Sequence, residues 1–298
     1  MERLFTALPT PFFDGNIDFV SLEKIIEIQI KNGVDGIVLS GSTGEGHSLS
    51  KAEWVNLIKF GVKLSNKRIK IVAGVGFNIT DTAVDYAKIA YDIGVDYLLA
   101  TTPYYNKPQQ EGIYKHFESI AKVFPLPIIL YNVPGRTVTD LQNETILKLA
   151  KDFKNIVALK DATGKLDRVG DLKEKIDNVR EDFVMLSGED ATQIGFNAMG
   201  GNGVVSVVSN IAPKLCKNIQ ELTKNNNFKD ALKLQNELVE LSKAMFCETN
   251  PVPVKYALYK LGIFKSEDCR LPLVKLSSNS KKIIDDVLNK YNIFDKLK

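Results

Sequence analysis

The sequence predicts an α/β fold, a (β/α)8 TIM barrel with an appended C-terminal helical domain. Two observations carry this prediction. Short runs of apolar and β-branched residues recur eight times, and stretches with helical spacing lie between them. Near-continuous apolar strands that alternate with amphipathic helices are typical of a parallel sheet covered on both faces. Eight such units favour a closed barrel over an open, doubly wound sheet.

The expected strands follow one another at regular intervals. They are residues 4–10, 36–41, 69–76, 96–104, 127–134, 156–163, 183–190 and 203–210. Helical spacing over 21–33 and 80–94 predicts two of the connecting helices, and each of these stretches ends in glycine, a common helix terminator.

After residue 210 the pattern is helical to the end of the chain. The predicted helices are 213–225, 227–246, 251–262 and 279–291. The first would close the barrel, and "NNNF" at 225–228 is the expected linker. The sequence therefore predicts a catalytic barrel over 1–225 and a helical domain over 226–298.

Composition excludes several classes of protein. Lys and Arg number 39 against 36 Asp and Glu, so a net charge of +3 gives no electrostatic argument for nucleic acid or an anionic membrane. The three cysteines form no C-x-x-C pair, and the N-terminus lacks the apolar core of a signal peptide. We expect a soluble, cytoplasmic protein. His47 and His116 are the only histidines, too few for a typical metal site without a cluster of carboxylates.

In a barrel of this kind, active sites lie at the C-terminal ends of the strands and in the loops that follow them. Hydroxyls, phenols, one amine and one guanidinium occupy those ends. The polar and glycine positions there are Ser42, Thr43, Asn78, Tyr104, Tyr105, Tyr131, Arg136, Lys160, Gly188, Glu189 and Asp190.

Lys160 closes the apolar run "IVALK". A strand-end lysine taken alone usually extends to water or pairs with a neighbour such as Asp161. The alternative is a nucleophile that attacks a ketone to form an imine, since desolvation at a barrel mouth favours the neutral amine. The imine would withdraw electrons, so that a proton leaves the neighbouring carbon and an enamine attacks an aldehyde.

The neighbouring strand ends supply companions for this chemistry. Tyr131 could pass protons as a general acid and base, or merely pack its ring. The glycines of "GSTGE" let backbone N–H groups around Ser42 and Thr43 approach a carboxylate, although this could be a plain turn. Arg136, in a rigid Pro-Gly turn, could clamp a second carboxylate.

Five motifs in order carry a resemblance to a known family. "GSTGE", "TPYYNKP", "ILYNVPGRT", "LKDATG" and "SGED" resemble the dihydrodipicolinate synthase/N-acetylneuraminate lyase family, from the N-terminus to about residue 275. "YNVPGRT" resembles the synthase branch, because sialic acid lyases usually lack its arginine. The resemblance implies a lyase that condenses pyruvate with L-aspartate 4-semialdehyde in diaminopimelate and lysine biosynthesis, without metal or organic cofactor.

The resemblance also implies a role for each site residue. Lys160 matches the lysine that forms the imine with pyruvate, and Tyr131 the tyrosine that moves protons. Thr43 matches the threonine that links Tyr131 to a second tyrosine, Tyr105, which in the family reaches into the neighbour's site across a tight dimer. The remaining matches bind substrate: Ser42, Thr43, Gly188 and Val205 line the pyruvate pocket, and Arg136 binds the semialdehyde carboxylate. The assembly it implies is a homotetramer, a dimer of dimers.

Two departures from the family pattern stand out. Ser42 replaces the threonine of many synthases, a form shared with lyases and sugar-acid aldolases. At the position of the acidic residue that lysine-inhibited members use, beside Asn78 and Tyr104, this chain has Thr82. Lys51 and Trp54 also replace polar residues typical of sensitive bacterial forms. We therefore expect weak or absent inhibition by lysine.

Other functions remain as alternatives. An aldolase of the same family, acting on sialic acid or a 2-keto-3-deoxy sugar acid, is the nearest; Arg136 and the paired tyrosines argue against it. "AGVGFN" and "GGNG" form neither G-x-G-x-x-G nor a P-loop, which argues against a nucleotide site. "SGSTG" does not fit the G-x-S-x-G of a serine hydrolase. A non-catalytic barrel that only binds a ligand is a further alternative. It is disfavoured because all the expected catalytic positions carry the residues that catalysis needs.

Overall fold

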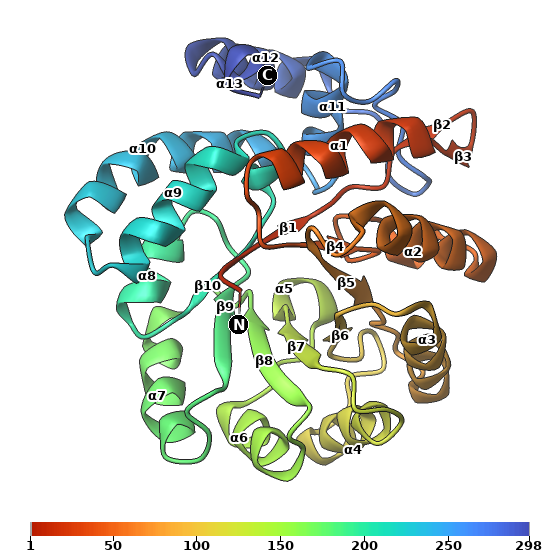
Figure 1. Cartoon of the computed structure of the whole chain (residues 1–298), viewed down its shortest axis with the longest axis vertical. Helices are drawn as coiled ribbons and strands as arrows, with labels where there is room; N and C mark the ends of the chain where they lie inside the picture. The colour runs from red at the N-terminus through yellow and green to blue at the C-terminus, as the bar shows by residue number, and fades with distance from the viewer. Residues whose placement is uncertain (1, 298) are drawn as a thin grey trace.

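A computed structural model describes residues 2–297 and contains the predicted barrel. Eight parallel strands close in the order β1-β10-β9-β8-β7-β6-β5-β4. Figure 1 shows these strands at the centre, ringed by helices. Their bounds are β1 Leu4–Ala7, β4 Gly36–Leu39, β5 Lys70–Gly74, β6 Tyr97–Thr101, β7 Ile128–Asn132, β8 Ile156–Asp161, β9 Val184–Ser187 and β10 Gly203–Ser206. All eight predicted strands are confirmed, although each is shorter than the apolar run that predicted it.

The helices of the barrel follow the strands in the alternating pattern. Their bounds are α1 Phe19–Lys31, α2 Lys51–Ser65, α3 Thr80–Ile93, α4 Gln110–Ala121, α5 Pro134–Thr137, α6 Asn143–Asp152, α7 Leu166–Asp177, α8 Gln193–Ala198 and α9 Pro213–Lys224, with short 3-10 turns η1 Gly46–Ser48 and η2 Val208–Asn210. The predicted glycine terminator of α3 is confirmed, since Gly94 takes the left-handed conformation at φ 87°.

The remaining helices lie after the barrel. They are α10 Phe228–Met245, α11 Val252–Lys260, α12 Ser278–Lys290 and α13 Ile293–Lys296. In Figure 1, α11, α12 and α13 lie at the top, outside the ring of barrel helices. The expected linker at 225–228 forms a tight turn, in which Asn227 caps α10 by accepting from the Asp230 N–H. The division of the chain at residue 225 stays a prediction.

A small hairpin near the N-terminus was not predicted. Strands β2 (Phe12–Phe13) and β3 (Asn16–Ile17) pair antiparallel. Asp14 and Gly15 have φ values of 48° and 76°. Two positive φ values are what the commonest two-residue hairpin turn requires, and an Asp-Gly pair is its sequence signature. The Asp14-Gly15 pair is visible in the sequence, in the loop that follows the first predicted strand.

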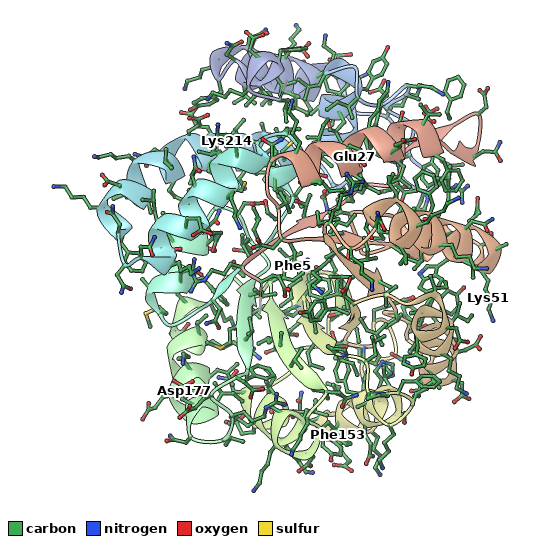
Figure 2. The ribbon with its side chains drawn as sticks, in the orientation of Figure 1. Phe5, Glu27, Lys51, Phe153, Asp177 and Lys214 are labelled. Atoms are coloured by element: carbon green, nitrogen blue, oxygen red, sulfur yellow. The ribbon has the colours of Figure 1, made fainter. Side chains whose placement is uncertain are left out.

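The centre of the barrel is a packed core. Phe5 is fully buried and pairs in register with Gly36 on the next strand. A Cβ on Gly36 would lie 2.5 Å from the Phe5 ring, so only glycine leaves room for it. Figure 2 shows Phe5 at the centre, while Lys51 and Asp177 lie at the periphery. Among residues 2–297, no helix is long and apolar enough to cross a membrane.

Candidate active site

The carboxyl ends of β7 and β8 bring two predicted residues together. Tyr131 and Lys160 are register partners on these parallel strands, so both side chains point to the same face of the sheet. Lys160 Nζ lies 4.2 Å from the centroid of the Tyr131 ring. Only 7% of Lys160 and 5% of Tyr131 is exposed. A buried amine beside a phenol, in a cavity, is placed for attack on a carbonyl carbon, with a group nearby that can carry the protons.

The next residue of each strand faces the opposite side, as strand alternation requires. Asp161 Oδ2 lies 3.5 Å from Arg168 Nε, and the Arg168 guanidinium donates to Asp140 at 2.8 Å. Asn132 Nδ2 donates to Asp140 at 2.7 Å. This network ties the ends of β7 and β8 to α7 and to the segment after α5, which holds Lys160 and Tyr131 in position.

A cavity of about 490 Å³ opens above these strand ends. Six of the eight predicted site residues line it: Ser42, Thr43, Tyr131, Arg136, Lys160 and Gly188. Gly188 must be glycine because a Cβ there would lie 2.5 Å from Ala162 Cβ. These predicted residues bring one amine, one phenol, two hydroxyls and one guanidinium to the cavity wall.

The other two predicted residues lie outside this lining. Val205 is buried in β10, and Val207, two residues further, lines the cavity instead. Tyr105 follows β6 and is 89% exposed. Its φ of 72° is uncommon for a non-glycine residue and marks a turn.

The loop after β4 carries the two hydroxyls. Thr43 is buried, and Ser42 is half-buried at the cavity wall. The turn needs small residues, because a Cβ on Gly46 would lie 2.2 Å from the Ser40 carbonyl oxygen and one on Gly44 would lie 2.9 Å from the Ser40 nitrogen. The glycines of the "GSTGEG" stretch thus allow the backbone to fold tightly beside the cavity.

Arg136 lies in α5 at the mouth of the cavity and is exposed. Its Nη2 donates to the Asn250 carbonyl oxygen at 3.1 Å. The Asn250 side chain in turn donates from Nδ2 to Thr43 Oγ1 at 2.9 Å. One residue from the C-terminal helical segment therefore contacts both the guanidinium and the hydroxyl of the site.

The C-terminal helices contribute a wall that the sequence analysis did not assign to the site. Its lining residues are Ser242, Lys243, Phe246 and Asn250. They lie on α10 and in the connection to α11. From the sequence, their helical spacing indicates only that they pack against other elements. No strand-end signal marks them, because they follow no barrel strand.

Asp190, noted as a strand-end residue without an assigned role, lines the same cavity as Lys160. Its carboxylate accepts from Ser206 Oγ at 2.5 Å and from the Val207 and Val208 N–H groups at 2.8 and 3.1 Å. Burial raises the pKa of Asp190, and these donors, together with the charge of Lys160, oppose that rise. The carboxylate fixes the chain after β10 and supplies a negative charge near the amine.

A second cavity of about 290 Å³ adjoins the first. The two share Ser42, Val133 and Arg136 as lining residues, and Tyr104 lines the second cavity alone. Across residues 2–297, no group of three or more His, Cys, Asp or Glu side chains could hold a metal ion. The polar groups that line the first cavity include amines, a phenol, hydroxyls, a guanidinium and the carboxyls of Glu189 and Asp190.

Known proteins share this sequence and architecture. The sequence model described as "Dihydrodipicolinate synthetase family" matches residues 1–291. The 4-hydroxy-tetrahydrodipicolinate synthase of Bartonella bacilliformis is 47% identical over 97% of this chain and 97% of its own. The dihydrodipicolinate synthase structure from Aquifex aeolicus has a TM-score of 0.96 at 38% identity, covering 98% of this chain and 99% of that one. The chloride-inhibited dihydrodipicolinate synthase from Acinetobacter baumannii, complexed with pyruvate, has a TM-score of 0.93 at 41% identity, covering 98% and 99%. The chain belongs to the dihydrodipicolinate synthetase family.

Proposed function

We propose that the chain is a 4-hydroxy-tetrahydrodipicolinate synthase, a lyase that condenses pyruvate with L-aspartate 4-semialdehyde in diaminopimelate and lysine biosynthesis. The observation that carries the proposal is the buried Lys160 amine 4.2 Å from the Tyr131 ring, in a cavity that also holds Arg136. The relatives named for this activity, 43–47% identical, support the same assignment.

Each step uses a group in the cavity. The Lys160 nitrogen attacks the keto carbon of pyruvate, and the carbinolamine loses water to give an imine. The imine withdraws electrons, so a methyl proton leaves and the resulting enamine carbon bonds to the aldehyde carbon of the semialdehyde. The amino group of the semialdehyde then displaces Lys160 from the imine carbon, which restores the free amine. Tyr131 carries the protons that these steps release and require.

Two anionic groups on the substrates need partners. We assign the pyruvate carboxylate to the loop of Ser42 and Thr43, whose glycines admit an anion close to the backbone, with Gly188 and Val207 lining the same cavity. We assign the semialdehyde carboxylate to Arg136, because a guanidinium can bind a carboxylate through two parallel hydrogen bonds. Arg136 lies at the mouth, where a second substrate would enter after pyruvate is bound.

We further propose that the enzyme works in the cytoplasm as a homo-oligomer, a tetramer built from two tight dimers. The exposure of Tyr105, which is 89%, supports this: a phenol that does not line its own cavity would be free to complete the relay of Thr43 and Tyr131 in a second copy. Sedimentation of the purified chain measures the assembly. A species that stays monomeric at catalytic concentrations while fully active would contradict the role of Tyr105.

The function is tested by trapping the imine. The protein is incubated with pyruvate and reduced with borohydride, and the adduct is located by peptide mass spectrometry. We expect the adduct on Lys160. An adduct on Lys243, the other lysine lining the cavity, would contradict the mechanism, as would the absence of any adduct on folded protein.

The acceptor is tested by turnover. Without borohydride, we expect the enzyme to consume pyruvate together with aspartate semialdehyde, and not to cleave sialic acid or 2-keto-3-deoxy sugar acids. Arg136→Ala should raise the KM for the semialdehyde about 10- to 100-fold, the loss of one charged hydrogen-bonded contact. Faster turnover of a sugar acid would assign the chain to the aldolases of the family instead.

A further inference from the structure

Asn250 connects Arg136, in α5, to Thr43, in the loop after β4, through two hydrogen bonds. It precedes α11, lines the catalytic cavity and is 6% exposed. We propose that Asn250 is a positioning residue that fixes the direction of the Thr43 hydroxyl, so that Thr43 donates its proton into the relay. The inference rests on the proposed function, and it concerns how that relay is oriented.

The chemistry follows from the inventory of a hydroxyl. A threonine hydroxyl has one proton to donate and can accept two. Asn250 Nδ2 donates to Thr43 Oγ1 at 2.9 Å, so this contact uses an acceptor position and leaves the threonine proton free. In a cavity shared with Tyr131, that proton can stabilise the phenol oxygen when it is carrying negative charge.

The side chain and the backbone of Asn250 serve different partners. Its backbone carbonyl oxygen accepts a hydrogen bond from the Arg136 side chain, while its side-chain amide donates to Thr43. Within the described residues, Asn250 Oδ1 is buried without a hydrogen-bond partner. A side-chain substitution therefore removes the donor to Thr43 and leaves the carbonyl that holds Arg136.

This separation gives a specific kinetic signature. Asn250→Ala should lower kcat about 10- to 100-fold while the KM for the semialdehyde stays within about twofold. Thr43→Val should lower kcat at least as much. Because Asn250 acts through Thr43, the double variant should be no slower than Thr43→Val alone, which is a non-additive cycle.

A second variant separates hydrogen-bond direction from shape. Asn250→Asp keeps the size of the side chain but can only accept, so the Thr43 hydroxyl must turn its proton toward it. We expect Asn250→Asp to be as slow as Asn250→Ala, whereas a shape-filling role predicts near wild-type kcat. Asn289→Ala, at an exposed position of α12, is the matched control and should leave kcat unchanged.

The outcomes are distinguishable. Three results would each overturn the inference. The losses in kcat of Asn250→Ala and Thr43→Val could multiply in the double variant, Asn250→Ala could change only the KM for the semialdehyde, or Asn250→Asp could keep a kcat near that of the wild type. Circular dichroism and thermal melting of each variant identify unfolding. If the wild type itself forms no pyruvate imine and no condensation product, the proposed function fails; an active wild type with unaffected Asn250 variants contradicts only the inference.

Discussion

Lys160 and Tyr131 face each other across the β7–β8 ladder, with the Lys160 amine 4.2 Å from the centre of the tyrosine ring. Their relationship is set by the backbone, because register partners on parallel strands necessarily share a face. Neither side chain needs a loop to bring it into place. A site built on strands in this way keeps its geometry more precisely than one built on loops.

Removing the phenol oxygen tests this arrangement. Tyr131→Phe keeps the ring beside Lys160 and removes the proton carrier, so we expect kcat to fall by about 100-fold or more with little change in stability. Steady-state assays and the rate of borohydride trapping measure the loss. Tyr114→Phe, on α4 outside the cavity, is the matched control. A Tyr131→Phe enzyme within twofold of wild-type kcat would contradict the role given to the phenol.

We expect the response to lysine to depend on the charges near Tyr104 and Asn78. Thr82, on α3, offers no carboxylate for the ammonium group of a bound lysine. The Lys51 Nζ forms an ion pair with Asp85 Oδ2 at 2.5 Å. We therefore expect L-lysine to inhibit weakly or not at all in initial-rate assays. Thr82→Glu should strengthen inhibition, because it adds the missing opposite charge. A micromolar inhibition constant for the wild type would show that another group binds the ammonium.

The barrel and much of its site could be predicted because both depend on local patterns. Each strand is an apolar run. Lys160 and Tyr131 lie at the carboxyl ends of their strands and Thr43 follows one, and the barrel must bring these ends together. Asn250 could not be predicted, since it contacts Thr43 from 207 residues further along the chain. The exposure of Tyr105 likewise depends on tertiary packing. What the sequence hides is the set of contacts that the C-terminal helices make with the barrel mouth.

One such contact is a fully buried ion pair. Glu45, in the loop after β4, bonds to Lys255 Nζ of α11, and both side chains are 0% exposed. Glu45 also accepts from the Arg270 N–H at 2.9 Å, and Lys255 donates to the Asp268 carbonyl at 2.7 Å. Burial lowers the pKa of Lys255, and the charge of Glu45 opposes that shift. The pair anchors the loop of Ser42 and Thr43 to the C-terminal helices.

Breaking this pair should destabilise the protein strongly. Lys255→Met leaves the Glu45 carboxylate buried without its partner, so we expect the free energy of unfolding to fall by about 3–5 kcal/mol, measured by urea denaturation. Adding Glu45→Gln should recover part of the loss, since the uncompensated charge is then removed. Lys296→Met, which breaks an exposed pair with Glu237, is the control and should cost at most about 1 kcal/mol. Equal losses in the two single variants would contradict the account of Glu45 and Lys255.

His116 should make the fold sensitive to mild acid. It lies in α4, is 3% exposed, and shares a 3.0 Å hydrogen bond through Nδ1 with Thr80. Burial lowers its pKa from 6.5 to about 4. The unfolded chain therefore binds a proton near pH 6.5 that the folded protein accepts only near pH 4. It follows that the free energy of unfolding falls as the pH drops through this interval, by up to ~3 kcal/mol.

The difference between two proteins isolates this effect from the carboxylates that also titrate below pH 5. His116→Gln cannot take up the proton, so we expect its free energy of unfolding to fall less steeply than that of the wild type between pH 6.5 and 4. Urea denaturation at half-unit pH steps gives both curves. Above pH 7.5, His116 is neutral in both the folded and the unfolded wild type, so the two curves should run parallel there. Parallel curves over the whole range would mean that His116 is protonated in the folded protein as readily as in the unfolded chain, which its burial between α3 and α4 opposes.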